Sequence, residues 1–228
     1  MCRLILIETS TSLCSTALAE NGRIVCSRRS SEPRAHASLT AVFVQEMMNE
    51  AGWNAPDAVA VSMGPGSYTG LRVGVSTAKG LCFGAGIPLL SVGTLETLCR
   101  QAIEEGLLPE GCRHIVPMVD ARRMEVYTAV FTPEGEQLTE IRPQVITAES
   151  FRAERNAGPV LVIGDGAGKC RELLAGPQVS FVQTCPTASG MLQPALREFE
   201  AGHFRDVAYF EPFYLKDFVA TVSRKKLF

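Results

Sequence analysis

The sequence predicts an α/β protein of two lobes, and the prediction depends on two observations. Short apolar runs alternate with helix-like segments in both halves of the chain. An order of strand, acidic turn, strand and glycine turn begins near the N-terminus and returns about halfway along. Glu8 and Gly22 mark the first copy and lie 14 positions apart, whereas Asp120 and Gly135 mark the second at 15 positions. This similarity favours a duplicated unit, with chance hairpins as the alternative.

The first half is expected to form three strands, a helix, a strand and two more helices. Strands are predicted at residues 4–7, 14–19 and 23–27, because Asn21-Gly22 between apolar runs is a strong hairpin signal. Apolar side chains at helical spacing predict a helix over 37–51, with Gly52 as its stop. A buried strand at 58–63 leads into Gly64-Pro65-Gly66. Ser67 then caps a helix to about residue 84, and another helix follows at 94–105.

The second half repeats the alternation less clearly. Strands are predicted at 115–119, 125–132, 137–141 and 159–163, and a helix at 191–201. The Gly- and Pro-containing stretch 106–111 predicts the lobe boundary, which gives lobes of 1–108 and 109–228. The last segment, aromatic-rich over 209–218, is a candidate for packing back on the first lobe. The basic cluster Arg224-Lys225-Lys226 is expected to be solvated.

Composition excludes several classes of protein. Hydrophobic residues make up 46% and charged residues 20% of the 228-residue chain, an ordinary globular balance. The net charge of −2 argues against tight nucleic-acid binding by this chain alone. The apolar runs are too short for a signal peptide or a membrane span, so we expect a cytoplasmic protein. No C-x-x-C pair occurs, which predicts reduced and mostly buried thiols at Cys2, Cys14, Cys26, Cys82, Cys99, Cys112, Cys170 and Cys185.

The sequence contains no convincing catalytic or metal-binding constellation. His36, His114 and His203 lie far apart, without the spacing of a zinc or iron site. No nucleophile–base pattern occurs, so no catalytic residue is predicted. Glu8 and Asp120, each at the end of a predicted strand, could hold a magnesium–nucleotide complex between the lobes. Two carboxylates alone do not specify such a site.

The helix after Ser67 contains an unusual number of glycines. Each interior glycine costs about 1 kcal/mol relative to alanine, so something must compensate. A small-residue stripe at every fourth position lets another backbone approach closely: Gly70, Gly74, Ala78 and Cys82. Leu71, Val75 and Phe83 lie beside the stripe and are expected to cover the chain's own core, with Leu71 and Val75 also included in the candidate partner interface. Spacing alone leaves open whether the stripe packs inside the molecule or against a partner.

The turn before this helix is a candidate anion site, because backbone N–H groups at a helix N-terminus attract negative charge. The candidate residues are Ser10, Thr11, Gly64, Gly66 and Ser67. The turn matches neither G-x-G-x-x-G nor a P-loop, and the later GDGAGKC does not match a P-loop either. A purely structural role for each glycine turn is the alternative.

The chain resembles the TsaB family in five segments, which are ILIETSTSLCSTAL, the polar stretch around His36, GPGSYTGLRVGVSTAKGL, SVGTLETL and VDARRMEVYTAVF. The resemblance covers most of residues 4–132 and thins to GDGA at 164–167 and FYLK at 213–216. The GPGSYTGLR block is specific to the family. The opening block alone is typical of the wider superfamily of sugar-kinase, heat-shock-70 and actin-like ATPases.

The resemblance implies the two-lobed actin-like ATPase fold with duplicated ribonuclease-H-like units. It also implies a non-catalytic partner of TsaD, the subunit that carries out threonylcarbamoyl transfer to adenosine 37 of tRNA, together with association with the ATPase TsaE. Transfer RNA would then be bound only through the complex. The family's partner surface is formed by its first two helices, here 37–51 and 67–84, which favours the intermolecular reading of the stripe. Without its partner, the chain is expected to form a homodimer through the same face.

Two departures from the superfamily pattern bear on nucleotide and metal binding. Glu8 stands where the superfamily usually has Asp, and the paired histidines that hold metal in the catalytic relatives are missing. Both departures favour a scaffold without a cofactor of its own, and ATP at the interface shared with the catalytic subunit stays open. A self-sufficient ATP-dependent phosphotransferase is the alternative. A metallopeptidase would need the missing ligands.

Overall fold

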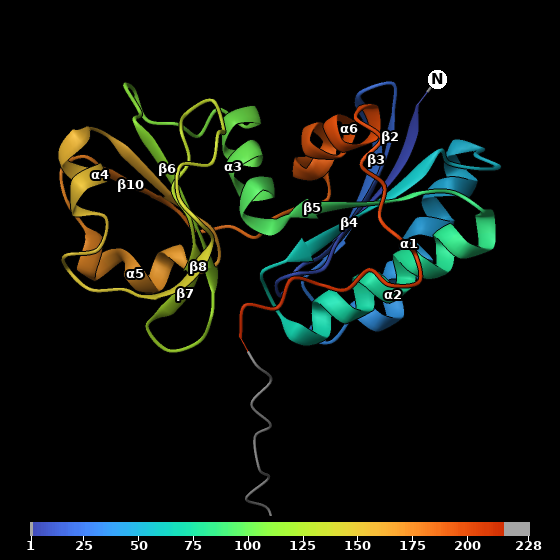
Figure 1. Ribbon diagram of the computed structural model, residues 1–228, viewed down its shortest axis with the longest axis horizontal. Helices are drawn as coiled ribbons and strands as arrows, with labels where there is room; N and C mark the ends of the chain where they lie inside the picture. The colour runs from blue at the N-terminus through green and yellow to red at the C-terminus, as the bar shows by residue number, and fades with distance from the viewer. Residues whose placement is uncertain (1, 217–228) are drawn as a thin grey trace, which may run out of the picture.

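The computed structural model describes residues 2–216 and places two α/β lobes side by side (Figure 1). Five strands and two helices precede a third helix that lies between the lobes (Figure 1). These elements are β1 (Arg3–Glu8), β2 (Cys14–Glu20), β3 (Arg23–Ser30), α1 (His36–Ala51), β4 (Ala58–Gly64), α2 (Tyr68–Ala85), β5 (Leu89–Gly93) and α3 (Thr94–Glu104).

The second lobe follows, and the chain then returns to the first. The second-lobe elements are β6 (His114–Asp120), β7 (Glu125–Thr128), β8 (Arg142–Val145), α4 (Arg152–Ala157), β9 (Val160–Ile163), α5 (Ala167–Leu174) and β10 (Val179–Val182). A 3₁₀ turn, η1 (Ser189–Met191), and α6 (Leu192–Glu200) complete the regular structure.

The two sheets have the same topology. The first has the order β3-β2-β1-β4-β5 and the second the order β8-β7-β6-β9-β10. In each sheet the first strand is central, with an antiparallel hairpin on one side and two parallel strands on the other. The duplication predicted from the glycine turns is therefore confirmed, as is the two-lobed α/β fold class.

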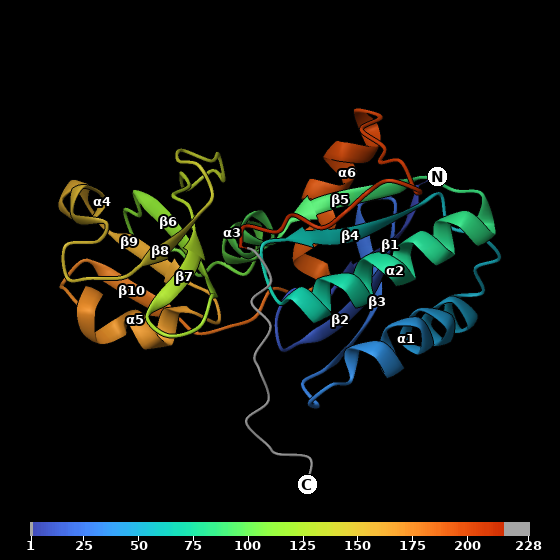
Figure 2. The ribbon, with the colours of Figure 1, turned by 60° about the horizontal axis from the view of Figure 1, so that its bottom comes forward.

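Alternating side chains of β1 build a core on each face of the first sheet. Leu4 and Leu6 pack in a cluster with Met191 and Leu192, whereas Ile5 and Ile7 belong to the cluster of α1 and α2. Figure 2 shows α1 and α2 on one side of this sheet and α6 on the other. The segment that begins at η1 thus packs on the first lobe.

α3 connects the two lobes through its packing. Leu95, Leu98 and Ala102 of this helix are fully buried in one cluster with Ile115 and Leu161 of the second sheet. The same helix also packs against η1, α6, β4 and β5 of the first lobe, so it contributes to both lobes.

Local differences from the expected elements have physical causes. The third strand of the second lobe is β8, not residues 137–141, because Val130 and Phe131 turn back on Gln137 and Leu138 in a narrow hairpin. β7 consequently ends at Thr128. The short elements β5, α4, α5 and β10 were not predicted.

After α6 the chain crosses the first lobe as an extended segment, residues 205–216, here called the C-terminal strap. Arg205 N donates to Leu89 O at 2.8 Å, and Phe213 N donates to Met63 O at 2.7 Å. Lys79 Nζ of α2 donates to the carbonyls of Ala208 and Phe210. The strap therefore lies along α2. The basic cluster at 224–226 lies outside the described residues, as do residues 217 and 218 of the aromatic-rich segment.

No helix within residues 2–216 is long and apolar enough to cross a membrane.

Candidate docking surface and interlobe site

The small-residue stripe of α2 faces the chain's own sheet. All four of its residues are buried, and an added Cβ would lie 2.1 Å from Thr9 O at Gly70 and 2.2 Å from Thr9 Oγ1 at Gly74. Thr9 Oγ1 also donates to Gly70 O at 2.9 Å. The close approach that the glycines permit is thus between α2 and β1 of one molecule. The intermolecular interpretation of Gly70, Gly74, Ala78 and Cys82 was wrong, and internal packing is correct.

Leu71 and Val75 are buried as well, so neither is available to a partner. Their expected role in the chain's own core is confirmed, whereas their inclusion in the candidate interface was wrong. In both cases the reason is the rotational phase of α2, which turns positions 70, 71, 74, 75, 78 and 82 to the sheet.

The opposite face of α2 has an exposed phenylalanine between two unexplained glycines. Phe83 is 85% exposed, which contradicts the expectation that it covers the core. Gly80 and Gly84 have no atom within 4 Å of an added Cβ, so nothing inside the described chain requires glycine there. At about 1 kcal/mol for each glycine, this helix face is weakened without an internal reason.

A hollow lies beside this face, between α2 and the C-terminal strap. It has a volume of about 530 Å³, and its lining residues are Lys79, Gly80, Phe83, Asp206, Val207 and Ala208. The next strap residue, Tyr209, is 85% exposed. We call Gly80, Phe83 and Gly84 with this hollow the docking face. α1 packs beside α2, and its Val42 side chain is 43% exposed. The two neighbouring helices therefore both carry exposed apolar side chains.

The candidate anion site at the start of α2 is filled by the chain itself. Ser67 N donates to Ser10 O at 2.6 Å, and Gly70 N donates to Ser67 Oγ at 3.3 Å, which confirms the predicted cap. An added Cβ at Gly66 would lie 2.3 Å from Ser10 O, so the turn needs glycine for close backbone contact. Thr11 is also buried, and its carbonyl oxygen accepts a hydrogen bond from His36 Nε2 at 2.9 Å. Ser67 N and Gly70 N, two donors on which the anion prediction depended, thus have partners within the chain, whereas the buried Ser10 Oγ has none among the described residues.

Glu8 lies at the end of β1 and is fully buried. Its Oε1 accepts from Ser10 N at 2.7 Å, while Oε2 has no hydrogen-bond partner within the described part of the chain. Burial raises the pKa of Glu8, hydrogen bonds from Ser10 and Ser62 lower it, and the nearby Asp165 charge raises it. A desolvated carboxyl that favours its neutral form is poorly suited to hold a metal ion.

Glu8→Gln is expected to make the protein more stable than wild type as the pH rises above about 4.5, the ordinary value for this carboxyl. The folded-state pKa is raised, so the wild type loses stability between the ordinary and the raised pKa, by up to about 1.4 kcal/mol per pH unit. Below the ordinary value the two proteins should converge. Urea midpoints measured across this range test the expectation, with the exposed-site variant Glu46→Gln as control. An unchanged pH profile in Glu8→Gln would contradict it.

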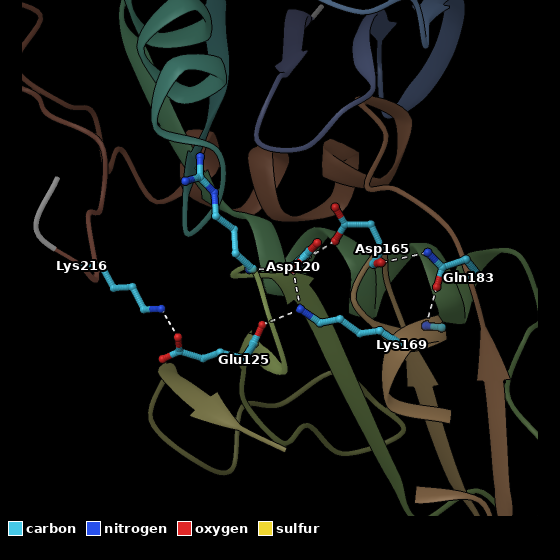
Figure 3. Close-up of polar contacts among 8 residues, drawn as sticks. Asp120, Glu125, Asp165, Lys169, Gln183 and Lys216 are labelled. Atoms are coloured by element: carbon cyan, nitrogen blue, oxygen red, sulfur yellow. Dashed lines mark hydrogen bonds and ion pairs between the residues drawn. The ribbon is translucent and has the colours of Figure 1, made fainter. Parts of the chain in front are cut away.

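The second lobe has its own polar cluster, which Figure 3 shows in close-up. Asp120, at the end of β6, accepts from Lys169 Nζ at 2.5 Å, and the same ammonium donates to Glu125 O at 2.7 Å. Asp165 Oδ1 accepts from Asp120 N at 2.9 Å. Burial raises the pKa of Asp165; the backbone N–H of Asp120 opposes that shift and the Asp120 charge adds to it.

Asp120 therefore faces an internal cation, and sequence reasoning missed this partner. Lys169 was considered only as a failed P-loop lysine, and its contact with a residue 49 positions earlier carries no local signal. Within residues 2–216, no group of three or more His, Cys, Asp or Glu side chains is arranged to hold a metal ion. The geometry thus offers a docking face on the first lobe and a neutralised carboxylate cluster on the second.

Known proteins of similar sequence and structure were found for this chain. A family profile described as TsaD, tRNA N6-adenosine threonylcarbamoyltransferase, matches residues 26–209. The tRNA threonylcarbamoyladenosine biosynthesis protein TsaB of Escherichia coli is 30% identical, with 96% of each chain covered. Its namesake in Bacillus subtilis is 28% identical, covering 74% of this chain and 73% of its own. The structure of YeaZ from Pseudomonas aeruginosa superposes with a TM-score of 0.78 at 27% identity, covering 94% of this chain and all of the other.

Proposed function

Because the chain belongs to the TsaB family, we propose that it is a non-catalytic subunit required for threonylcarbamoyl transfer to adenosine 37 of tRNA. It acts by binding and activating a TsaD-like catalytic subunit. The observation that carries this proposal is the docking face, where Phe83 stands exposed between Gly80 and Gly84 and is not covered by any other part of residues 2–216.

The shape of the docking face fits a partner helix. Glycines at i and i+4 on an exposed helix surface let a second backbone approach closely, and the adjoining hollow can accept an apolar side chain of that helix. Burying Phe83 would remove a large apolar side chain from water, worth about 2 to 3 kcal/mol. An exposed aromatic of this kind is typical of an interface anchor.

The interlobe geometry supports the absence of catalysis by this chain. A magnesium–nucleotide complex between the lobes would need accessible carboxylates from both sides. Glu8 is fully buried and its raised pKa favours the neutral form, while Asp120 is paired with Lys169. Transfer chemistry is therefore assigned to the partner, and ATP, where it takes part, to the interface shared with that subunit or to a TsaE-like ATPase.

The same face accounts for a homodimer of the isolated chain. Without its catalytic partner, the chain is expected to cover Phe83 by forming a homodimer, which the partner then replaces. Transfer RNA is reached through the complex, in keeping with the net charge of −2.

Co-purification with a TsaD-like subunit is expected to give a complex of the two chains. The isolated chain, titrated with magnesium and ATP, should bind the nucleotide only weakly. Tight magnesium-dependent binding together with failure to co-purify would instead support the phosphotransferase alternative.

A further inference from the structure

The turn between β6 and β7 presents two adjacent arginines in an unusual backbone conformation. Arg122 and Arg123 have φ values of 71° and 51°, the left-handed region that residues with a Cβ rarely adopt. Asp120 Oδ1 accepts from Arg122 N at 2.7 Å and holds this turn. Both arginines are exposed, and within residues 2–216 neither guanidinium has a hydrogen-bond or ion-pair partner. The turn therefore holds two unpaired positive charges side by side.

An aromatic cluster lies where α2 begins and the C-terminal strap ends. The rings of Tyr68 and Tyr214 have centroids 5.0 Å apart, and the Arg72 guanidinium stands 4.2 Å over the Tyr68 ring. Arg72 Nε also donates to Tyr214 Oη at 3.4 Å. Tyr214 is still 37% exposed, so part of its ring is open to solvent.

The strap joins the aromatic cluster to the arginine turn. Two residues after Tyr214, Lys216 pairs with Glu125 of β7 and lies 5.7 Å from the centroid of the Tyr127 ring. Glu125 N in turn donates to Arg122 O at 3.2 Å, so the ion pair of Lys216 lies beside the arginine turn. Six residues of the aromatic cluster, the strap end and the arginine turn are here called the interlobe rim, namely Tyr68, Arg72, Arg122, Arg123, Tyr214 and Lys216.

The charge of the interlobe rim favours an anionic ligand. The neighbouring carboxylates Asp120 and Glu125 each have a lysine partner. The negative charge of Glu211 helps to raise the pKa of Arg72. This leaves the two arginines of the turn as uncompensated positive charge.

We propose that the interlobe rim binds single-stranded RNA, with Arg122 and Arg123 on phosphates and Tyr214 stacked on an unpaired base. Interleaved guanidinium groups and partly exposed aromatic rings are what unpaired RNA loops require, since each base offers a flat face and each nucleotide a phosphate. The inference rests on the proposed function, because it places tRNA as the RNA in question. It refines that function by giving the non-catalytic chain its own contact with the substrate.

The test uses the complex of the full-length chain with a TsaD-like subunit, and a fluorescently labelled anticodon stem–loop RNA at low salt. The double variant Arg122→Gln/Arg123→Gln is expected to bind about 10-fold more weakly than wild type. It should also lower the slope of log K against log salt concentration by about 1.5, as the loss of two phosphate contacts predicts. Tyr214→Ala is expected to bind at least fivefold more weakly, with little change in that slope.

The matched control is Arg23→Gln/Arg29→Gln on the edge strand β3, which removes the same charge from exposed positions of the first lobe. The proposal is overturned if this control loses as much affinity as the Arg122/Arg123 variant. It is equally overturned if Tyr214→Ala binds like wild type, or if heparin, a polyanion without bases, binds as tightly as the RNA. Co-purification with the TsaD-like subunit should be retained by the Arg122/Arg123 variant, because the docking face lies elsewhere. A failure of RNA binding and a failure of partner binding are therefore seen separately.

Discussion

Replacing Phe83 with glutamate is expected to weaken the complex with a TsaD-like subunit by about 30-fold or more. The side chain is 85% exposed in the single chain and lines the hollow beside Gly80. A charge there would be buried without a partner in the complex, which costs about 2 kcal/mol or more at an interface anchor. Titration of the catalytic subunit with the labelled chain measures the change.

The fold of the Phe83→Glu variant should be unaffected, since the side chain contributes little to the core. Val145→Glu is a suitable control, because Val145 is a 63% exposed apolar residue on β8 of the other lobe. The control is expected to bind the partner like wild type. Equal affinities for wild type and Phe83→Glu would place the interface elsewhere on the molecule.

Gly70→Ala is expected to lower stability by about 3 kcal/mol, the largest effect of any single methyl group on α2. The new Cβ would lie 2.1 Å from the backbone oxygen of Thr9, a fully buried residue that directly follows β1. For a chain of this size the melting temperature should fall by roughly 6 to 12 °C. Gly74→Ala should follow, because its Cβ meets Thr9 Oγ1 at 2.2 Å and displaces the Thr9–Gly70 hydrogen bond.

Gly80→Ala on the same helix is the matched control and should have the opposite sign. Nothing lies within 4 Å of its added Cβ, so the gain in helix propensity of about 0.5 to 1 kcal/mol is expected to stabilise the free chain. Thermal unfolding of the three variants tests both expectations. Equal effects at positions 70 and 80 would contradict the burial assigned to the two faces of α2.

The contrast between these glycines explains what the sequence of α2 can and cannot predict. Where a helix starts and ends is a local property, so the Ser67 cap of α2 and the stop of α1 at Gly52 were both predicted correctly. Which face is buried is not local. Gly70, Gly74, Ala78 and Cys82 form one stripe of small residues, and Gly80 and Gly84 continue another, so composition does not distinguish them. Only the packing of α2 on β1 and β4 does.

The second lobe was predicted less completely for a related reason. β8 and β10 contain four residues each and α5 eight, which is too short for helical or strand periodicity to be decisive. The pairing of Lys169 with Asp120 joins residues 49 positions apart and follows from topology, because α5 begins beside the carboxyl end of β6. The acidic residue at the end of each first strand was recognised, but its surroundings were not.

The interlobe rim also combines distant parts of the chain. Tyr68 comes from the start of α2, Arg122 from a hairpin turn and Tyr214 from the strap, and nothing in their separate sequence contexts relates them. Along α2, Tyr68 and Phe83 are 15 residues apart, about 22 Å at 1.5 Å per residue. One helix can thus serve two surfaces, with the rim at its start and the docking face at its end.

The most direct test of the central claim is the rate of tRNA threonylcarbamoylation by a purified TsaD-like subunit, measured with and without this chain. The rate is expected to be negligible without the chain, to be restored by wild type and by Val145→Glu, and to stay low with Phe83→Glu at the same concentration. Full activity of the catalytic subunit alone, or full restoration by Phe83→Glu, would contradict activation through the docking face.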